Sequence, residues 1–405
     1  MKKLNYYKNN TEVLNDFGVV EGTVRNWIIK AKEYGIELTI ANNKLKIVRS
    51  DKNKEILQEL SIRSKKYKPN EDKLVIKIKR KQLKFLSENQ IISIISNLKT
   101  RKEINLKYSY MENGADLWSQ FYNEALADTK YDPCISDFQF LKQNYSFLKD
   151  FFGKYKKINV VDIGPGNSQQ SIPLLEQFEK DGFLNSYTAI DISQKMLEIS
   201  KKNVEEHLPE LKTNYVKLDL ETHSLQDTLY KIKRENKEKY PTLILFISGT
   251  VGSFENRNFV SFNIKEGMLE DDMIIFSNVF DNQSNTNLFP HSTALPKGYE
   301  FLTWFRRHLG FTDESVEDCA SFNERTGFKE FGFKATKDIL VTIPDYDESF
   351  YIYKSQIITT WKHKKDDWDT IYQLARDMDM EMRLVVRHPV HDNIMYMLTK
   401  PARIG

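Results

Sequence analysis

A short glycine-containing segment at residues 162–168, the glycine loop, constrains the fold of this chain more than any other feature. Its sequence is Asp-Ile-Gly-Pro-Gly-Asn-Ser, and it directly follows the apolar segment 158–161. Glycine is needed where a backbone turns sharply or approaches a ligand without a Cβ in the way. A strand that ends in such a loop and leads into a helix, predicted here at 171–180, is typical of an open α/β sheet. Ligands bind such sheets beyond the C-terminal ends of the strands.

Short apolar strands alternate with amphipathic helices beyond residue 158. Strands are predicted at residues 158–163, 186–191, 215–220, 242–247 and 273–279. This alternation specifies a parallel, doubly wound sheet. Two further adjacent strands, at 382–387 and 393–399, are expected in a methyltransferase sheet and not in a nicotinamide-binding sheet. The predicted fold class is therefore α/β, with a Rossmann-like sheet of the class I methyltransferase type.

Three aspartates end three successive predicted strands. Asp162 opens the glycine loop, and Asp191 follows Gly166 by 25 positions, where a carboxylate can accept hydrogen bonds from both ribose hydroxyls of a nucleoside. Asp219 can accept a hydrogen bond from the adenine amino group, and the next residue, Leu220, can pack against the adenine ring. Gln169 stands where a dinucleotide-binding loop would place its third glycine, which disfavours NAD. We therefore predict a binding site for S-adenosylmethionine (SAM) formed by Asp162, Gly164, Gly166, Asp191, Asp219 and Leu220.

The segment after the fourth predicted strand, residues 248–253, is where methyltransferases commonly contact the methyl acceptor, and we call it the acceptor loop. It reads Ser-Gly-Thr-Val-Gly-Ser and lacks the Asn/Asp-Pro-Pro-Tyr run of the usual amino-methylating DNA enzymes. Cys134 precedes the glycine loop and is misplaced for the nucleophile of a cytosine-C5 enzyme. Methyl transfer mainly requires alignment of the reactants, so no fixed catalytic triad is expected. If the nucleophile is an amine, a nearby base takes its proton.

Two segments resemble the histidine-specific N-alpha-methyltransferases of ergothioneine synthesis. Residues 107–118, Lys-Tyr-Ser-Tyr-Met-Glu-Asn-Gly-Ala-Asp-Leu-Trp, resemble that family's Tyr-x-x-x-Gly-Ser/Ala-x-Leu-Phe segment. Residues 245–254, Leu-Phe-Ile-Ser-Gly-Thr-Val-Gly-Ser-Phe, are similar to its Phe-Pro-Gly-Ser-Thr-Ile-Gly-Asn-Phe segment. The resemblance implies SAM-dependent N-methyl transfer to a small-molecule acceptor. It also implies a SAM-binding domain at 140–285 and 365–405, and a substrate-capping lobe at 106–139 and 286–364.

Three segments depart from the pattern of this family. Ser253 replaces the asparagine that holds the amino acid, and residues 127–133 retain only Tyr131 of the family's Leu-Pro-Glu-Tyr-Tyr-Pro-Thr-Arg run. The late Glu-x-Ser signature has no match, and residues 353–357 read Tyr-Lys-Ser-Gln-Ile. These departures favour a small amine or amino-acid-like acceptor over histidine itself. The residues predicted to contact the acceptor are Tyr108 and Tyr110 in the substrate wall, and Tyr131, Thr250 and Ser253 at the reacting atoms.

The first 68 residues are predicted to form a winged helix-turn-helix. Two helices, at 11–17 and 24–32 with Thr23 as the cap of the second, precede a hairpin at 37–48 around Asn42-Asn43. In such domains the second helix lies in the major groove of DNA. With Trp27 in the core, the predicted contacts to double-stranded DNA are Thr23, Arg25, Asn26 and Lys30.

Charge distinguishes the front of the chain from the remainder. Residues 1–105 carry 24 basic and 12 acidic side chains, whereas the remainder carries 36 basic and 45 acidic ones. A basic front favours a polyanionic partner, and a solvated lysine-rich surface is the alternative. Residues 69–105 are predicted to be a connector.

Two alternatives to a small-molecule enzyme remain: a DNA-binding regulator that senses SAM or a metabolite without turnover, and a nucleic-acid methyltransferase. DNA binding by one helix-turn-helix per chain favours a homodimer.

Composition limits the compartment and the cofactors. The sequence has no apolar run of the roughly 20 residues that a membrane span needs, and its basic N-terminus lacks the apolar stretch of a signal peptide. Its two cysteines, Cys134 and Cys319, give neither a disulfide framework nor a zinc spacing. We therefore expect a cytoplasmic protein with no membrane partner and no metal.

Overall fold

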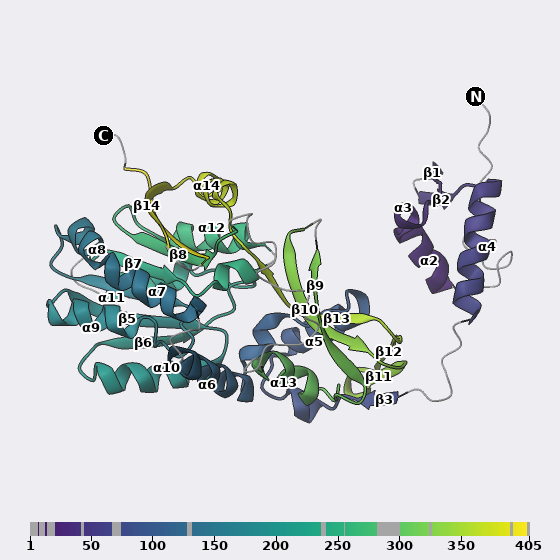
Figure 1. Cartoon of the computed structure of the whole chain (residues 1–405), viewed down its shortest axis with the longest axis horizontal. Helices are drawn as coiled ribbons and strands as arrows, with labels where there is room; N and C mark the ends of the chain where they lie inside the picture. Colours follow the sequence, from purple (N-terminus) through teal and green to yellow (C-terminus); the bar gives the residue numbers. More distant parts are fainter. Residues whose placement is uncertain are drawn as a thin grey trace. The chain divides into compact units, whose positions relative to one another are not determined.

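The computed structural model describes residues 7, 13, 21–41, 44–66, 74–127, 132–235, 240–254, 256–281, 300–323, 326–388 and 392–402. The chain divides into two compact units, Met1–Lys73 and Leu74–Gly405 (Figure 1). Within the described residues, no helix is both long and apolar enough to cross a membrane.

The N-terminal unit packs helices around a small apolar core. Its helices are α2 (Glu21–Ile29), α3 (Ala31–Tyr34) and α4 (Asp51–Lys66). Strand β1 (Leu38–Ala41) pairs antiparallel with β2 (Lys44–Ile47), which confirms the predicted hairpin strands. Trp27 is buried with Val24 and Ala31, as the spacing of these residues predicts.

Two details of the predicted helix-turn-helix differ from this structure or lie outside it. Because α2 begins at Glu21, Thr23 lies within the helix and is not its cap, so that prediction is wrong. Of the predicted first helix at 11–17, only Val13 belongs to the described residues.

The C-terminal unit is built on a seven-stranded sheet with the order β14-β15-β8-β7-β4-β5-β6. Strand β15 runs antiparallel to both its neighbours, and the other pairs are parallel. The strands are β4 (Ile158–Ile163), β5 (Leu184–Asp191), β6 (Thr213–Lys217), β7 (Thr242–Phe246), β8 (Met273–Val279), β14 (Glu381–Arg387) and β15 (Asn393–Thr399). The direction of winding reverses at β4, which places a ligand crevice at its C-terminal end. This order and the antiparallel β15 confirm the predicted class I methyltransferase sheet.

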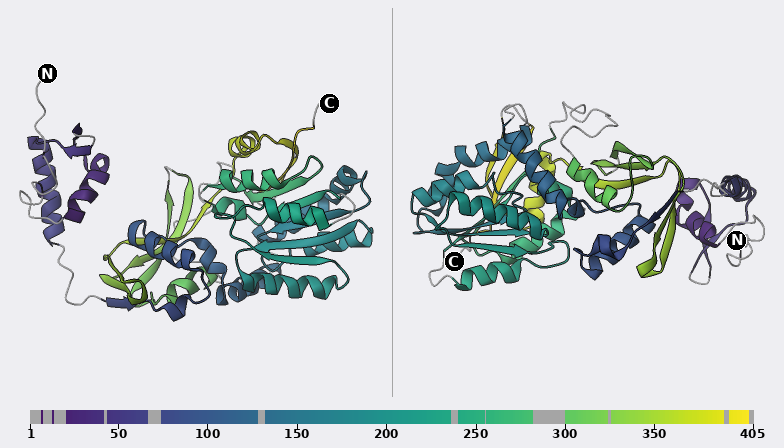
Figure 2. Two further views of the ribbon diagram at one scale, coloured as in Figure 1. Left: turned by 180° about the vertical axis from the view of Figure 1, so that it is seen from behind. Right: turned by 90° about the horizontal axis from the view of Figure 1, so that it is seen from below.

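Helices cover both faces of this sheet (Figure 2). One face packs against α7 (Asp132–Gln143), α8 (Tyr145–Phe152), α9 (Ile172–Lys180) and α10 (Gln194–His207). The other packs against α11 (Gln226–Glu235), α12 (Arg257–Gly267) and α14 (Trp368–Asp377). Every residue of β4 is buried because a strand covered on both faces alternates its side chains between two apolar cores.

The remainder of the C-terminal unit, residues 74–127 and 300–364, forms what we call the cap lobe. It contains two three-stranded sheets, β13-β10-β9 and β12-β11-β3. Its strands are β3 (Leu74–Lys77), β9 (Val316–Asn323), β10 (Phe328–Ala335), β11 (Ile339–Ile343), β12 (Glu348–Ile352) and β13 (Ile357–Lys364). Its helices are α5 (Glu88–Thr100), α6 (Asn113–Ala127) and α13 (Glu300–His308), with the 3-10 turns η1 (Arg80–Leu83) and η2 (Leu106–Tyr110).

The predicted connector at 69–105 is part of this lobe from Leu74 onward. Strand β3 pairs in parallel with β11, and α5 buries Ile91, Ile94 and Leu98 in the lobe's core. The sequence boundary at residue 139 also falls within α7, whose Phe140 packs under the methyltransferase sheet.

Candidate cofactor and acceptor site

The glycine loop contains three left-handed residues after β4, namely Gly164, Gly166 and Ser168. Gly164 has φ 64° and Gly166 has φ 56°, and the Gly164 N–H donates to the carbonyl of Ile190 at 2.8 Å. A Cβ at Gly166 would overlap the indole ring of Trp118 from α6. Glycine at position 166 is therefore required both by the backbone conformation and by the close approach of this ring.

Asp162, the first residue of the glycine loop, is fully buried. Its Oδ2 accepts hydrogen bonds from Ser171 and, at 3.1 Å, from the Tyr187 hydroxyl. Its Oδ1 has no hydrogen-bond partner among the described residues. Burial raises the pKa of this carboxyl to about 6, against the hydrogen bonds that lower it. Asp162 thus joins the loop to the helix and strand that follow it.

Asp191 is the last residue of β5, and Asp219 lies two residues after the end of β6. The Asp191 Oδ1 accepts the Ser193 N–H at 2.8 Å, and burial raises the pKa of this carboxyl to about 7. The Asp219 Oδ1 accepts the Glu221 N–H at 3.1 Å, and its Oδ2 accepts the Lys107 ammonium at 2.8 Å. Since β4, β5 and β6 are parallel neighbours, these carboxylates and the glycine loop lie at one edge of the sheet. Leu220 lies in the core beside α11, with 8% of its surface exposed.

The acceptor loop lies directly against the glycine loop. A Cβ placed on Gly164 would be 3.3 Å from the Thr250 Cγ2. Ser248 and Gly249 are left-handed, with φ of 66° and 68°, and Thr250–Ser253 forms the 3-10 turn η3. Thr250 is therefore the residue of the acceptor loop that contacts the glycine loop, and Ser253 is the last residue of η3.

Asp137 of α7 holds the start of the acceptor loop. Its Oδ2 accepts the Ser248 N–H and the Ser277 hydroxyl, each at 2.7 Å. Its Oδ1 is buried and has no hydrogen-bond partner among the described residues. Burial raises the pKa of this carboxyl to about 6, and the two hydrogen bonds act in the opposite direction.

His363 of β13 packs against the same loop from the cap lobe. Its Cε1 lies 3.3 Å from where a Cβ on Gly249 would stand, and its ring stacks on Trp361 with the centroids 5.5 Å apart. Its Nε2 is buried without a hydrogen-bond partner in the part of the chain that the structure describes. Burial, with nearby positive charges that include Lys365 and Lys329, lowers the pKa of His363 to about 4, so the ring is neutral at pH 7.

The three tyrosines predicted to contact the acceptor differ in their surroundings. Tyr108 is fully buried in the core of the cap lobe, stacked on Phe305 with the centroids 5.6 Å apart. The prediction that it lines the substrate wall is therefore wrong, because no part of its side chain is accessible. Tyr110 is half-buried and contacts Trp118 edge to face, beside the glycine loop. Tyr131 lies outside the described residues.

Four residues of this region were not predicted from the sequence. Trp118 ends the motif quoted for the family resemblance, so its place over Gly166 was within reach of the sequence. Lys107 begins the same motif. Asp137 and His363 carry no local signal, because each reaches the acceptor loop from an element far from it along the chain.

The chemistry of the residues at these strand ends suits an adenosyl ligand. A glycine loop with left-handed turns lies beside a carboxylate on the adjacent strand, and the buried Oδ1 of Asp162 has no protein partner within the described residues. Carboxylates accept hydrogen bonds from hydroxyl and amino groups, which are the donors of adenosine. In the same described part of the chain, no group of His, Cys, Asp and Glu side chains is arranged to hold a metal ion.

A family model for histidine-specific, SAM-dependent methyltransferases matches residues 88–400. The chain belongs to this family. It is therefore a SAM-dependent methyltransferase, as the sequence predicts, and SAM is its cofactor. The match begins at α5, so the N-terminal unit and β3 of this methyltransferase precede it. No curated protein matches the chain in sequence.

Solved methyltransferase structures resemble the chain at low sequence identity. Magnesium protoporphyrin IX methyltransferase from Synechocystis, with bound SAH, is 12% identical, with 73% of this chain and 98% of that one covered and a TM-score of 0.41. A SAM-dependent methyltransferase from Clostridium acetobutylicum is 11% identical, with 64% and 90% covered and a TM-score of 0.37. A glycopeptide N-methyltransferase complexed with sinefungin is 11% identical, with 64% and 86% covered and a TM-score of 0.35.

Replacing Gly166 by alanine tests the close approach of the loop to Trp118. The new Cβ would overlap the indole ring in a backbone conformation that alanine disfavours, so we expect the affinity for S-adenosylhomocysteine (SAH) to fall at least tenfold. Gly182→Ala is the matched control, because Gly182 has φ 69° but no atom within 4 Å of its Cβ position. Calorimetric titration of SAH should show the loss in the first variant only. Equal losses would mean that backbone strain alone, and not the site, determines the effect.

The raised pKa of Asp191 predicts that cofactor affinity depends on pH. Hydroxyl donors favour the ionised carboxyl, whereas the free protein binds a proton there below pH 7. Binding must then release that proton, so SAH affinity is expected to fall by up to about tenfold per pH unit below 7 and to level off above it. Titrations between pH 5.5 and 8.5 measure the slope. Asp191→Asn should bind more weakly with a flatter profile, and an unchanged slope in this variant would assign the proton to another group.

Proposed function

We propose that this methyltransferase transfers the methyl group of SAM to the nitrogen of a small amine or amino-acid-like molecule. The observation that carries the proposal is the contact between the acceptor loop and the glycine loop at Thr250 and Gly164. This contact would put an acceptor held by residues 248–253 next to the cofactor, as in-line displacement requires. We assign the cofactor contacts to Gly164, Gly166, Asp191 and Asp219, with Asp162 at the start of the loop.

The side chains around the acceptor loop suit an amine. SAM supplies a methyl group on a sulfonium, and an amine must be unprotonated to accept it. The Asp137 carboxyl, whose pKa burial raises to about 6, is the proposed group to receive that proton, since its Oδ1 is unpartnered among the described residues. Thr250, Ser253 and Tyr110 are proposed to contact the acceptor. Neutral His363 would add a hydrogen-bonding atom from the cap lobe.

Histidine itself is one acceptor to be tested and not the one we favour. The family is described as histidine-specific. Ser253, however, stands where the resemblance places the asparagine that holds the amino acid, and a serine hydroxyl offers one donor and no amide. A change of side chain at this position alters which polar groups of an acceptor can be satisfied.

Calorimetric titration of SAM and SAH into the wild type and Asp191→Ala tests the cofactor assignment. We expect micromolar binding to the wild type and a loss of roughly tenfold to a hundredfold in the variant, because hydrogen bonds to a charged group are removed. Glu205→Ala is the control, since this carboxylate is exposed on α10. A folded wild type that binds neither ligand would contradict the proposed function. Binding is then followed by mass spectrometry of amino acids and small amines incubated with SAM, beginning with L-histidine.

We also propose that the N-terminal unit binds double-stranded DNA. Arg25, Asn26 and Lys30 are exposed on or directly after α2, whereas Val24 and Trp27 of that helix are buried. Thr23 is partly exposed and remains a proposed contact. A homodimer would present two such helices to two half-sites. We also propose a cytoplasmic location for the protein, which suits both a small-molecule acceptor and DNA.

DNA binding is tested by fluorescence anisotropy with duplexes of random sequence. We expect the full chain to bind with an affinity that falls steeply between 50 and 200 mM salt, as phosphate contacts require. A chain that begins at Leu74 should lose DNA binding and keep SAH binding, and Arg25→Ala should weaken DNA binding alone. Equal DNA binding by the shortened chain would contradict the proposal. DNA binding together with SAM binding but no methylated acceptor would favour the regulator.

A further inference from the structure

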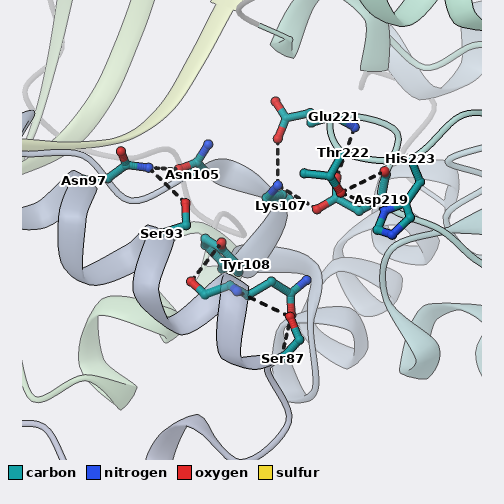
Figure 3. Close-up of polar contacts among 11 residues, drawn as sticks. Ser87, Ser93, Asn97, Asn105, Lys107, Tyr108, Asp219, Glu221, Thr222 and His223 are labelled. Carbon is teal, nitrogen blue, oxygen red and sulfur yellow. Dashed lines mark hydrogen bonds and ion pairs between the residues drawn. The ribbon is translucent and has the colours of Figure 1, made fainter. Parts of the chain in front are cut away.

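The side chains of two adjacent residues, Lys107 and Tyr108, contact different parts of the C-terminal unit (Figure 3). The Tyr108 ring is buried in the core of the cap lobe, and its hydroxyl donates to the Gln90 carbonyl at 3.4 Å. The Lys107 ammonium instead lies 2.8 Å from Asp219 and 2.8 Å from Glu221, in the segment that follows β6 of the methyltransferase sheet. The turn η2 thus fastens the cap lobe to the strand end where we place the adenine ring.

This ion-pair cluster is largely shielded from solvent. The side chains of Lys107, Asp219 and Glu221 are 17%, 11% and 31% exposed. Burial acts to lower the pKa of Lys107, but the two carboxylates outweigh it and raise that pKa, so the side chain stays charged. Without the ammonium, two neighbouring carboxylates would repel each other in a poorly solvated place. Lys107 therefore offsets the repulsion between these carboxylates and, with the Glu221 N–H, holds the Asp219 side chain.

Asp219 can hold Lys107 and a ligand at once. An ionised carboxylate accepts about four hydrogen bonds. Two of these go to the Glu221 N–H and the Lys107 ammonium. An adenine amino group can take a remaining one without displacing the lysine, so the ion pair supports binding and does not compete with it.

The segment that follows Lys107 contacts the other strand ends too. Trp118 packs against Gly166 of the glycine loop, and Asn123 accepts a hydrogen bond from Asn167 at 3.1 Å. Asp116 lies 3.4 Å from Lys195 at the start of α10, directly after β5. One continuous stretch of the cap lobe, residues 107–123, therefore contacts the segments that follow β4, β5 and β6.

We propose that Lys107 is a positioning residue for the cofactor, which holds Asp219 in place for the adenine amino group and thereby couples docking of the cap lobe to SAM binding. The inference rests on the cofactor role proposed for Asp219. Coupling between two binding events is reciprocal, so a cofactor that requires the docked segment also stabilises its docking. SAM would then order residues 107–123 over the site before the acceptor reacts.

The test compares Lys107→Met, Lys107→Arg and the control Lys99→Met in the full chain. Lys99 makes an ion pair of 2.8 Å with Glu348 entirely within the cap lobe, so its loss removes a similar contact without touching the site. We expect SAH affinity to fall roughly tenfold in Lys107→Met, to recover largely in Lys107→Arg and to be unchanged in Lys99→Met. In Asp219→Asn, adding Lys107→Met should cost little more, because the two residues act as one unit.

Hydrogen exchange provides a measurement that would not change if Lys107 had only a structural role. In the wild type, SAH should slow exchange over residues 106–127, and saturating SAH should slow it less in Lys107→Met than in Lys99→Met. Equal SAH affinity in Lys107→Met and the wild type, or tighter binding in the variant, would overturn the proposal while leaving the proposed function intact. A folded wild type that does not bind SAH would overturn both.

Discussion

The buried carboxylate of Asp162 holds the turn on which the rest of the site depends. It accepts hydrogen bonds from Ser171, at the start of α9, and from Tyr187 of β5, so that strand, helix and loop meet at one side chain. Above it, Gly164 and Gly166 adopt left-handed conformations and have no Cβ. Moving this turn would displace its contacts with Thr250 and Trp118.

The site is assembled from two directions around that turn. The sheet supplies carboxylates at successive strand ends, because parallel neighbours end at the same edge. The cap lobe supplies Lys107, Trp118 and His363 from three of its elements. The first set suits a ligand with hydroxyl and amino donors, and the second fixes or covers the loops that would hold it.

Features that depend on residues adjacent in the chain could be predicted from the sequence, whereas contacts between residues far apart in the chain could not. The position of Gly164, Gly166, Asp191 and Asp219 at neighbouring strand ends could be predicted because a strand and the loop that follows it are adjacent in the chain. Residues 74–105 were taken for a connector because the partner of β3 is β11, far along the sequence. Tyr108 was wrongly assigned to the substrate wall because a motif does not reveal which of two neighbouring side chains faces the core. Asp137 is one polar residue in a helix, and only the tertiary structure brings it to Ser248.

The connections between the cap lobe and the sheet limit how the lobe can move. The chain passes between them three times, after α6, after β8 and after β13. The last two passages are tied together by a parallel bridge between Phe280 and Asp366, and the Asp366 N–H donates to the Val279 carbonyl at 2.9 Å. Any hinge between the lobe and the sheet must therefore include all three connections, and the bridge between Phe280 and Asp366 makes two of them move together.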